Sequence, residues 1–204
     1  MQRHTAGGRI WYGVKDMINQ ASIRTSSSHP LRVDTVDVGE AGGIIGMTLC
    51  PGRRDSLSIE GTWERNLSTD IATISAWEPA LVISLVEDFE FELLGVPSFA
   101  VAMLEANLSW RHLPIRDAGV PDASFEKAWL TTGNEARDIL RRGGRVLLHC
   151  RAGLGRTGMI AARLLVEFGS MPENAIAAVR QARAGTIETQ AQERYVYSVI
   201  TIET

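Results

Sequence analysis

The amino-acid sequence predicts a single-domain α/β protein with a central, mostly parallel (mixed) sheet of about five strands flanked by helices. Short apolar segments typical of buried strands alternate with amphipathic segments typical of helices. A chain of 204 residues, 45% of them apolar and 22% charged, has the composition of a globular domain with a sizeable core. Because strands joined through helical crossovers pair in parallel, these observations favour a largely parallel sheet covered by helices.

The first thirty residues differ from the rest of the chain. Residues 1–30 contain breaker-rich stretches at Gly7-Gly8 and Thr25–Ser28, and a turn signal at His29-Pro30. The segment from Ile10 to Ile23 has only a weak helical period, which leaves open whether it docks on the domain. We therefore expect an amino-terminal arm over 1–30 and the folded domain over 31–204.

Regular patterning begins at Val33 and first indicates strands. Alternation predicts a strand over Val33–Val38, an apolar run predicts another over Ile44–Cys50, and Gly42-Gly43 suits a hairpin between them. The short apolar run Ala80–Val86 predicts a fully buried strand. Two further strands are expected over Trp110–Ile115 and Arg145–His149.

Helix-capping residues and the spacing of apolar residues predict the helices. Ser68 is expected to cap a helix ending near Trp77, with Ile71 and Ile74 on one face. Ser124 is expected to cap a long helix that ends at Gly143-Gly144. The remaining predicted helices run over Pro97–Asn107, Thr157–Phe168 and Pro172–Arg183, and from Thr189 towards the carboxyl terminus.

Charge and cysteine content exclude several classes of protein. A net charge of −3 provides no basic field for nucleic acid or an anionic membrane. Two cysteines in a chain of this length do not form a disulfide framework, which favours a reducing, cytoplasmic setting. We find no signal peptide and no apolar run near the roughly 18 residues that span a bilayer. No cofactor or metal is expected, because the histidines lack ligand spacing; they are His4, His29, His112 and His149.

The strongest chemical signal is the loop after the last predicted strand. It has the sequence Cys-Arg-Ala-Gly-Leu-Gly-Arg from Cys150 to Arg156, and a helix follows. Glycines at 153 and 155 let the backbone N–H groups turn inward beside the positive end of that helix, which makes an anion-binding concavity. The planar guanidinium of Arg156 can close it by binding two phosphate oxygens. The expected phosphate-binding residues are Arg151, Ala152, Gly153, Leu154, Gly155 and Arg156.

Cys150 lies at the base of this predicted concavity. Inward N–H groups, a helix amino terminus and a nearby arginine all favour a thiolate over a thiol. The same groups would stabilise the charge that develops as sulfur attacks phosphorus, so we expect Cys150 to be a nucleophile. Thr157 could donate its hydroxyl to the departing sulfur. His149 is either a satisfied core histidine or a group that tunes Cys150. The structural alternative, a buried thiol beside a simple helix start, does not account for the whole motif.

Hydrolysis of a phosphate ester also needs a proton on the leaving oxygen. Asp117 lies just past a predicted strand end, in a loop where Gly119 and Pro121 permit movement. Asp122 is the competing carboxylate, but its position suits a cap for the helix that follows. We therefore expect Asp117 to be the general acid, and then the base that activates water.

These motifs resemble a known superfamily. The segment from His149 to Gly158 matches the protein tyrosine and dual-specificity phosphatase signature, His-Cys-x5-Arg-Ser/Thr. The segment from His112 to Asp122 is similar to the cyclin-dependent-kinase-associated phosphatase branch, and the looser similarity extends from Cys50 to Tyr195.

The resemblance implies a cysteine-dependent phosphatase acting on phosphotyrosine and on phosphoserine or phosphothreonine in proteins. It implies Cys150 as nucleophile, Arg156 as phosphate clamp, Asp117 as general acid and Thr157 as support for the leaving thiolate. Gln192 resembles a family glutamine that helps to place the hydrolytic water, although glutamine on a helix is usually a solvated surface residue. A phosphorylated protein would be the partner.

Other functions remain open at this point. The tyrosine-bearing substrate loop of classical tyrosine phosphatases is not evident. Phosphoinositide phosphatases of the superfamily usually have lysines where Arg151 and Leu154 stand, so only one of the two charges is kept. A sulfurtransferase of the rhodanese kind would need neither Asp117 nor the loop glycines. A phosphoresidue-binding module without activity would be expected to lack Cys150, Arg156 or Asp117.

Cys50 ends an early predicted strand and has two interpretations. It is a small buried hydrophobic residue, which we prefer, or the partner of Cys150 in an oxidative disulfide. The sequence does not set the distance between the two, and a disulfide needs Cα atoms within roughly 7 Å.

Overall fold

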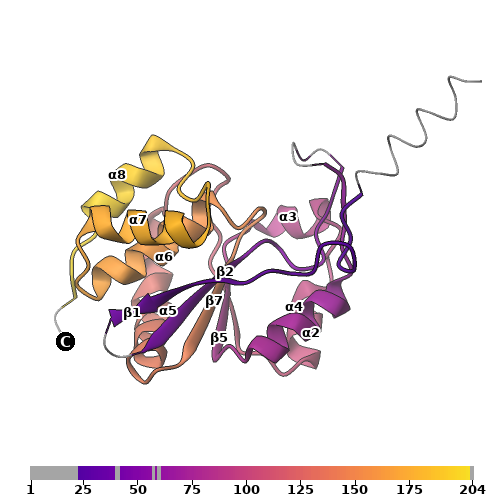
Figure 1. Ribbon diagram of the computed structural model, residues 1–204, viewed down its shortest axis with the longest axis horizontal. Helices are drawn as coiled ribbons and strands as arrows, with labels where there is room; N and C mark the ends of the chain where they lie inside the picture. Colours follow the sequence, from indigo (N-terminus) through magenta and orange to yellow (C-terminus); the bar gives the residue numbers. More distant parts are fainter. Residues whose placement is uncertain (1–22, 40–41, 57, 59–60, 203–204) are drawn as a thin grey trace, which may run out of the picture.

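The computed structural model describes residues 23–39, 42–56, 58 and 61–202 and contains one central sheet of five strands (Figure 1). Their order is β1-β2-β7-β5-β6, and β1 pairs antiparallel with β2 while the other neighbours are parallel. The predicted α/β class and mixed, mostly parallel sheet are confirmed. The strands span β1 Asp34–Val38, β2 Gly43–Thr48, β5 Leu81–Ser84, β6 Trp110–His112 and β7 Arg145–His149.

Helices cover both faces of this sheet, and each face has its own apolar core. On one face α5, α6 and α7 contact the strands, and Val146 and Leu148 of β7 belong to this core. On the other face α2 and α4 pack together over Val82 and Leu147. The helices span α2 Leu67–Trp77, α3 Asp88–Leu93, α4 Phe99–Glu105, α5 Ala123–Arg141, α6 Gly155–Glu167, α7 Pro172–Ala182 and α8 Gln190–Ser198.

Strand composition explains this two-sided burial. Successive side chains of β7 point to opposite faces, and Val146, Leu147 and Leu148 are all fully buried. The same holds for β5 from Leu81 to Ile83. A continuous apolar run is what a central parallel strand needs, and it is what the sequence shows at both places.

The two serines predicted as caps do not cap their helices, whereas the suggestion that Asp122 is a cap is confirmed. The helix expected to begin at Ser68 is capped by Asn66, whose Oδ1 accepts the Thr69 N–H at 2.9 Å. The helix expected to be capped by Ser124 is capped by Asp122, whose Oδ1 accepts the Phe125 N–H at 2.8 Å. In both cases an Asn or Asp shortly before the serine provides the better acceptor for the free amides of the first turn.

Some elements were not predicted. Helix α3 follows β5 directly, and a small two-stranded sheet pairs β3, Arg54–Asp55, with β4, Trp63–Glu64. The strand expected over Trp110–Ile115 ends at His112, because the chain then turns into the loop that contains Asp117.

Most of the expected amino-terminal arm, residues 1–22, lies outside the described residues. Of the remainder, Arg24 forms an isolated bridge with Trp63, and the Ser26 hydroxyl accepts the Asn66 N–H at 2.9 Å. No helix among the described residues is long and apolar enough to cross a membrane.

Candidate active site

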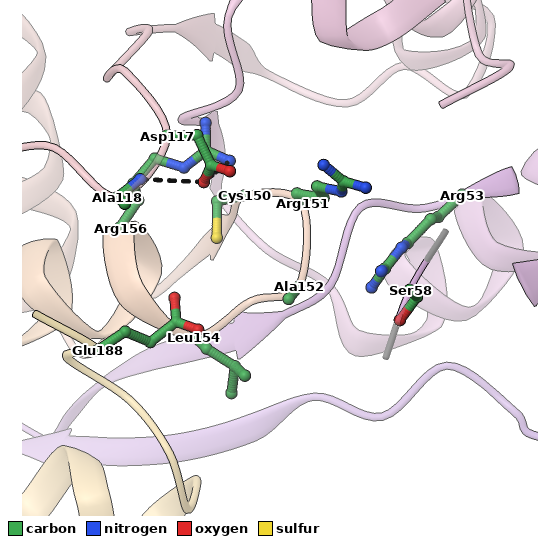
Figure 2. A pocket seen from close by; sticks show the side chains of 10 residues that line it. All are labelled: Arg53, Ser58, Asp117, Ala118, Cys150, Arg151, Ala152, Leu154, Arg156 and Glu188. Carbon is green, nitrogen blue, oxygen red and sulfur yellow. Dashed lines mark hydrogen bonds and ion pairs between the residues drawn. The ribbon is translucent and has the colours of Figure 1, made fainter. Parts of the chain in front are cut away.

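The candidate site lies where the parallel strands end. Cys150 directly follows β7, and the chain segments after β5 and β6 supply Glu90 and Asp117. The carboxyl ends of parallel strands meet at one edge of a sheet, which is the usual position of sites in α/β folds. A pocket of about 330 Å³ opens there, and Cys150 and Arg156 both line it (Figure 2).

The loop from Cys150 to Arg156 depends on its glycines. Gly153 has a φ of +72°, and a Cβ there would lie 2.3 Å from the Thr48 carbonyl oxygen. Any side chain would therefore push the loop away from β2. Gly155 begins α6 at the pocket, so the positive end of this helix faces the place where an anion would sit.

Arg183, from the end of α7, holds the outer side of this loop. Its Nη2 donates to the Ala152 carbonyl oxygen at 3.0 Å, and its Nε donates to the Gly153 carbonyl oxygen at 2.7 Å. Its Nη1 pairs with Asp34 at 2.6 Å. Because two loop carbonyls are bound on the outside, they are kept from facing an anion in the pocket.

Arg156 is almost fully buried and is fixed by a carboxylate. Its Nη1 and Nη2 donate to the two Glu90 oxygens at 2.5 and 3.0 Å, and Nη1 also donates to the Ile115 carbonyl oxygen at 3.0 Å. Burial by itself lowers the pKa of Arg156, but the Glu90 hydrogen bonds and the negative charges of Cys150, Glu90 and Asp117 raise it above the ordinary value. Arg156 is therefore a fixed cation.

Asp117 lies beside Arg156 and remains largely exposed. Its Oδ1 is 3.0 Å from Arg156 Nη2, and its side chain is 59% exposed. Its own N–H donates to Glu87 Oε2 at 3.3 Å, and the next residue, Ala118, has a φ of 55°. The structure thus brings together Cys150, Arg156 and Asp117, as the motifs predicted, and separates Asp122 from them as a helix cap.

Helix α8 supports the loop that contains Asp117. Gln192 is fully buried, and its Nε2 donates to the Gly119 carbonyl oxygen at 3.2 Å. Its Oε1 accepts the Glu188 N–H at 2.9 Å, and the Thr189 hydroxyl donates to the Ala118 carbonyl oxygen at 3.5 Å. Gln192 is therefore not a solvated surface residue; it connects the start of α8 with the Asp117 loop.

His149 is fully buried beneath the site. Its Nε2 lies 2.5 Å from the Ser84 hydroxyl, which accepts a hydrogen bond from Trp110 Nε1 at 2.7 Å. Burial lowers the pKa of His149 to about 3, with smaller contributions from His112 and Arg156. The ring is therefore neutral at physiological pH, and the Ser84 contact holds it against the end of β5.

Thr157 is also fully buried. Its hydroxyl has no hydrogen-bond partner among the described residues. A buried hydroxyl without a partner is costly, so Thr157 is available to another group in the site.

The side chains of the loop point in different directions. Arg151 turns towards Asp55, to which its Nε and Nη2 donate at 3.0 and 2.8 Å. Leu154 lies on the opposite side, near Glu188 (Figure 2). Arg151, Ala152 and Leu154 all line the pocket.

Sequence reasoning missed several residues of the site, among them Glu90, Arg183 and Glu188. Glu188 lines the pocket, and its Oε2 accepts the Gly155 N–H at 2.8 Å. Glu90 follows Glu87 at the spacing of a capping box, a signal that could have revealed α3. Arg183 and Glu188 offered no local signal, because their partners are distant in sequence.

Neither Cys50 nor Cys150 is in a disulfide. Cys50 is fully buried, and its N–H donates to the Arg151 carbonyl oxygen at 3.2 Å. Burial raises the pKa of Cys50 far above its ordinary value, and the neighbouring charge of Cys150 raises it further. Cys50 is thus a protonated core thiol close to the site. The described residues contain no cluster of His, Cys, Asp and Glu that could hold a metal ion.

Comparison with protein families gives a match over most of the chain. A family model described as PTP-SAK, Swiss Army Knife protein, DSP-PTPase phosphatase domain, matches residues 57–196. Human cyclin-dependent kinase inhibitor 3 is 31% identical over 111 residues, which are 53% of this chain and 51% of that protein. Tyrosine-protein phosphatase CDC14 of Saccharomyces cerevisiae is 34% identical over 90 residues, 43% of this chain and 16% of that protein. The chain thus spans about half or less of the length of these two relatives.

Solved structures show the same fold. Kinase associated phosphatase (KAP) superposes with a TM-score of 0.72 at 23% identity, covering 82% of this chain and 93% of that one. Tk-PTP superposes with a TM-score of 0.59 at 24% identity, covering 76% and 90%. At these identities the likeness concerns the fold. Together with the family match, it confirms the resemblance to the cyclin-dependent-kinase-associated phosphatase branch that the two motifs predicted.

Proposed function

The chain belongs to the PTP-SAK family of DSP-PTPase phosphatase domains, and from this premise we propose that it is a phosphoric monoester hydrolase. Its substrates are phosphoproteins containing phosphotyrosine and phosphoserine or phosphothreonine. One observation supports this most: Cys150 lies in a pocket with a buried, permanently charged Arg156, and Asp117 is held 3.0 Å from that arginine.

In the first step the Cys150 sulfur attacks phosphorus, and the bond from phosphorus to the ester oxygen breaks. Arg156 and the inward amides of the loop hold the three non-bridging oxygens and stabilise their charge. Asp117 gives its proton to the leaving oxygen, which departs as an alcohol or phenol. A cysteinyl phosphate remains on the enzyme.

In the second step water attacks the phosphorus, and the sulfur leaves. Asp117, now a carboxylate, takes a proton from that water, and inorganic phosphate is released. The hydroxyl of Thr157, which has no partner among the residues that the structure describes, donates to the departing sulfur. Gln192 acts indirectly, because it fixes the loop on which Asp117 stands.

Hydrolysis of aryl phosphates tests the assignment. Cys150→Ser should abolish turnover, and Asp117→Asn should lower kcat by about 10²–10⁴-fold with a poor leaving group. With a strongly acidic phenol as leaving group the Asp117→Asn loss should shrink, since that phenolate departs without a proton.

Asp122→Asn is the matched control. Asn caps a helix about as well as Asp, so this variant should keep both its stability and its rate. Full activity in Cys150→Ser would exclude the mechanism. If Asp122→Asn lowered the rate as much as Asp117→Asn, the assignment of Asp117 as the general acid would be wrong.

A further inference from the structure

The loop that contains Asp117 is attached to two helices. At its carboxyl end it runs into α5, which Asp122 caps. In its middle it is bound from α8, where Gln192 Nε2 donates to the Gly119 carbonyl oxygen at 3.2 Å. The position of Asp117 therefore depends on how the first turns of α5 and α8 are placed relative to each other.

A side-chain hydrogen bond joins these two helices. The Tyr195 hydroxyl of α8 donates to Glu126 Oε1 of α5 at 2.8 Å. Tyr195 follows Gln192 by three residues, and Glu126 follows Asp122 by four. Each end of the bond is thus about one helical turn from a point where the loop is attached. Because α8 otherwise packs on α6 and α7 (Figure 1), this bond fixes α8 to the helix that follows the loop.

Arg163 of α6 holds both partners of this hydrogen bond in place. Its Nη1 donates to Glu126 Oε1 at 2.8 Å and also to the Tyr195 hydroxyl oxygen. Its Nε donates to Glu167 Oε1 at 2.8 Å, and its Cζ is 4.8 Å from the centre of the Trp129 ring. Burial raises the pKa of Tyr195 above its ordinary value, against the opposing charge of Arg163, so the hydroxyl keeps its proton.

The Asp117 loop needs support from outside because its own backbone is strained. Ala118 has a φ of 55°, a left-handed conformation that alanine rarely adopts. Such a conformation persists only where the surrounding structure holds it. The Asp117 side chain is 59% exposed, and a bound phosphate would compete for its ion-pair partner Arg156. A small shift of α8 would therefore let the loop relax and move the carboxyl group.

We propose that Tyr195 is a positioning residue for the general acid: its hydroxyl joins α8 to α5 and so holds the Asp117 carboxyl group at the leaving oxygen of the substrate. Tyr195 does not line the pocket that contains Cys150, so it acts through the loop backbone. This inference rests on the proposed function and adds to it a residue on which proton transfer depends. The transfer itself is unchanged, because Asp117 still gives its proton to the leaving oxygen.

Two aryl phosphates test this role, one with a poor leaving group and one that releases a strongly acidic phenol. The value of kcat/KM reports the step in which the ester bond breaks, where the poor leaving group needs a proton. Tyr195→Phe should lower it about tenfold for the poor leaving group and by less than about twofold for the acidic phenol. Inhibition by inorganic phosphate should be unchanged, because Arg156 stays in place. An equal loss with both esters, or no loss with either, overturns the proposal.

Asp117→Asn distinguishes this role from a general weakening of the structure. Without the acid there is no proton transfer for Tyr195 to improve. Adding Tyr195→Phe to Asp117→Asn should therefore change kcat/KM for the poor leaving group by less than about twofold. A further loss of about tenfold in the double variant would mean that Tyr195 acts on another step, and it would overturn the proposal.

Glu126 offers a second way to break the same hydrogen bond. Glu126→Ala should reproduce the effect of Tyr195→Phe, and the two changes together should cost no more than either alone. Glu126→Gln keeps an acceptor oxygen and should retain most of the rate. Tyr197→Phe is the control, because Tyr197 is exposed on the same helix and should keep the wild-type rates. Wild-type rates in Glu126→Ala would contradict the role of this bond.

The same measurements keep this inference separate from the proposed function. If the poor leaving group is cleaved slowly by Asp117→Asn but at the wild-type rate by Tyr195→Phe, only the role of Tyr195 is refuted. A wild-type protein that cleaves neither aryl phosphate refutes the proposed function itself.

Discussion

Ionisable side chains at the site have fixed partners. Arg156 is bound by Glu90, and the neutral ring of His149 is bound by Ser84. Glu188 also has a partner, because its carboxylate accepts the Gly155 N–H, but this contact lies in the pocket. A phosphate that uses this amide must displace the carboxylate, so Glu188 opposes anion binding at this point.

His149 leads to a prediction about acid stability. Its pKa is about 3 in the folded protein and 6.5 ordinarily, so only the unfolded chain binds a proton between these values. The free energy of unfolding should therefore fall as the pH drops below about 6.5, by up to about 1.4 kcal/mol per pH unit from this residue. His149→Asn lacks the titrating group and should lose less stability than wild type on acidification.

Urea denaturation of both proteins at about pH 7 and about pH 5 checks this prediction. The other titrating groups are common to both chains, so the difference between them reports on His149. A stability gap that stays constant over this range would show that His149 binds protons equally in the folded and unfolded states, and would contradict a lowered pKa.

At the scale of elements, helices from the carboxyl-terminal third hold the catalytic loop and the Asp117 loop in place. Arg183 at the end of α7 binds two carbonyls of the first loop, and Gln192 of α8 binds a carbonyl of the second. Neither side chain lines the pocket. Arg183 and Gln192 therefore affect catalysis indirectly, because they fix the backbone of the two loops that hold the catalytic residues.

Arg183→Met should expose this indirect role. Without its hydrogen bonds the carbonyls of Ala152 and Gly153 are free to turn, so kcat/KM for an aryl phosphate should fall by about 10–100-fold. Inhibition by inorganic phosphate should weaken as well, which loss of stability alone would not cause in the folded protein. Arg111→Met is the control, because Arg111 pairs with Glu135 on an exposed surface and should change either quantity little. Normal phosphate inhibition in Arg183→Met would contradict the role.

The parts of the site that the sequence predicted are local in the chain. Cys150, the loop glycines and Arg156 lie in one short segment between an apolar strand and a helix. The motif and the predicted secondary structure could therefore be recognised together. Asp117 was found because it follows a strand end. Glu90, Arg183 and Glu188 were missed because each acts on a partner far along the chain, and only the folded sheet brings them together. The cap at Asn66 was missed because the nearest serine was chosen over a better acceptor, whereas the position of Asp122 had suggested its role as a cap.

At the scale of the whole molecule, an anion site exists only when the sheet is formed. The catalytic loop follows β7, Glu90 follows β5, Asp117 follows β6, and α8 closes the site from the end of the chain. An unfolded chain cannot hold these segments together. Binding of an oxyanion must therefore stabilise the native state by mass action.

Tungstate, a phosphate-like oxyanion, should thus raise the melting temperature. At a concentration about 100 times its Kd, the gain in unfolding free energy is about 2.7 kcal/mol, which corresponds to roughly 5–10 °C for a domain of this size. Sodium chloride at equal ionic strength is the control and should have little effect, because simple screening does not reproduce bidentate binding to Arg156. Cys150→Ser should keep most of the shift, since the loop amides and Arg156 remain, whereas Arg156→Lys should lose most of it. An equal rise in melting temperature in tungstate and chloride would mean that the pocket does not bind oxyanions. The proposed reaction would then lack a phosphate-binding site in this protein.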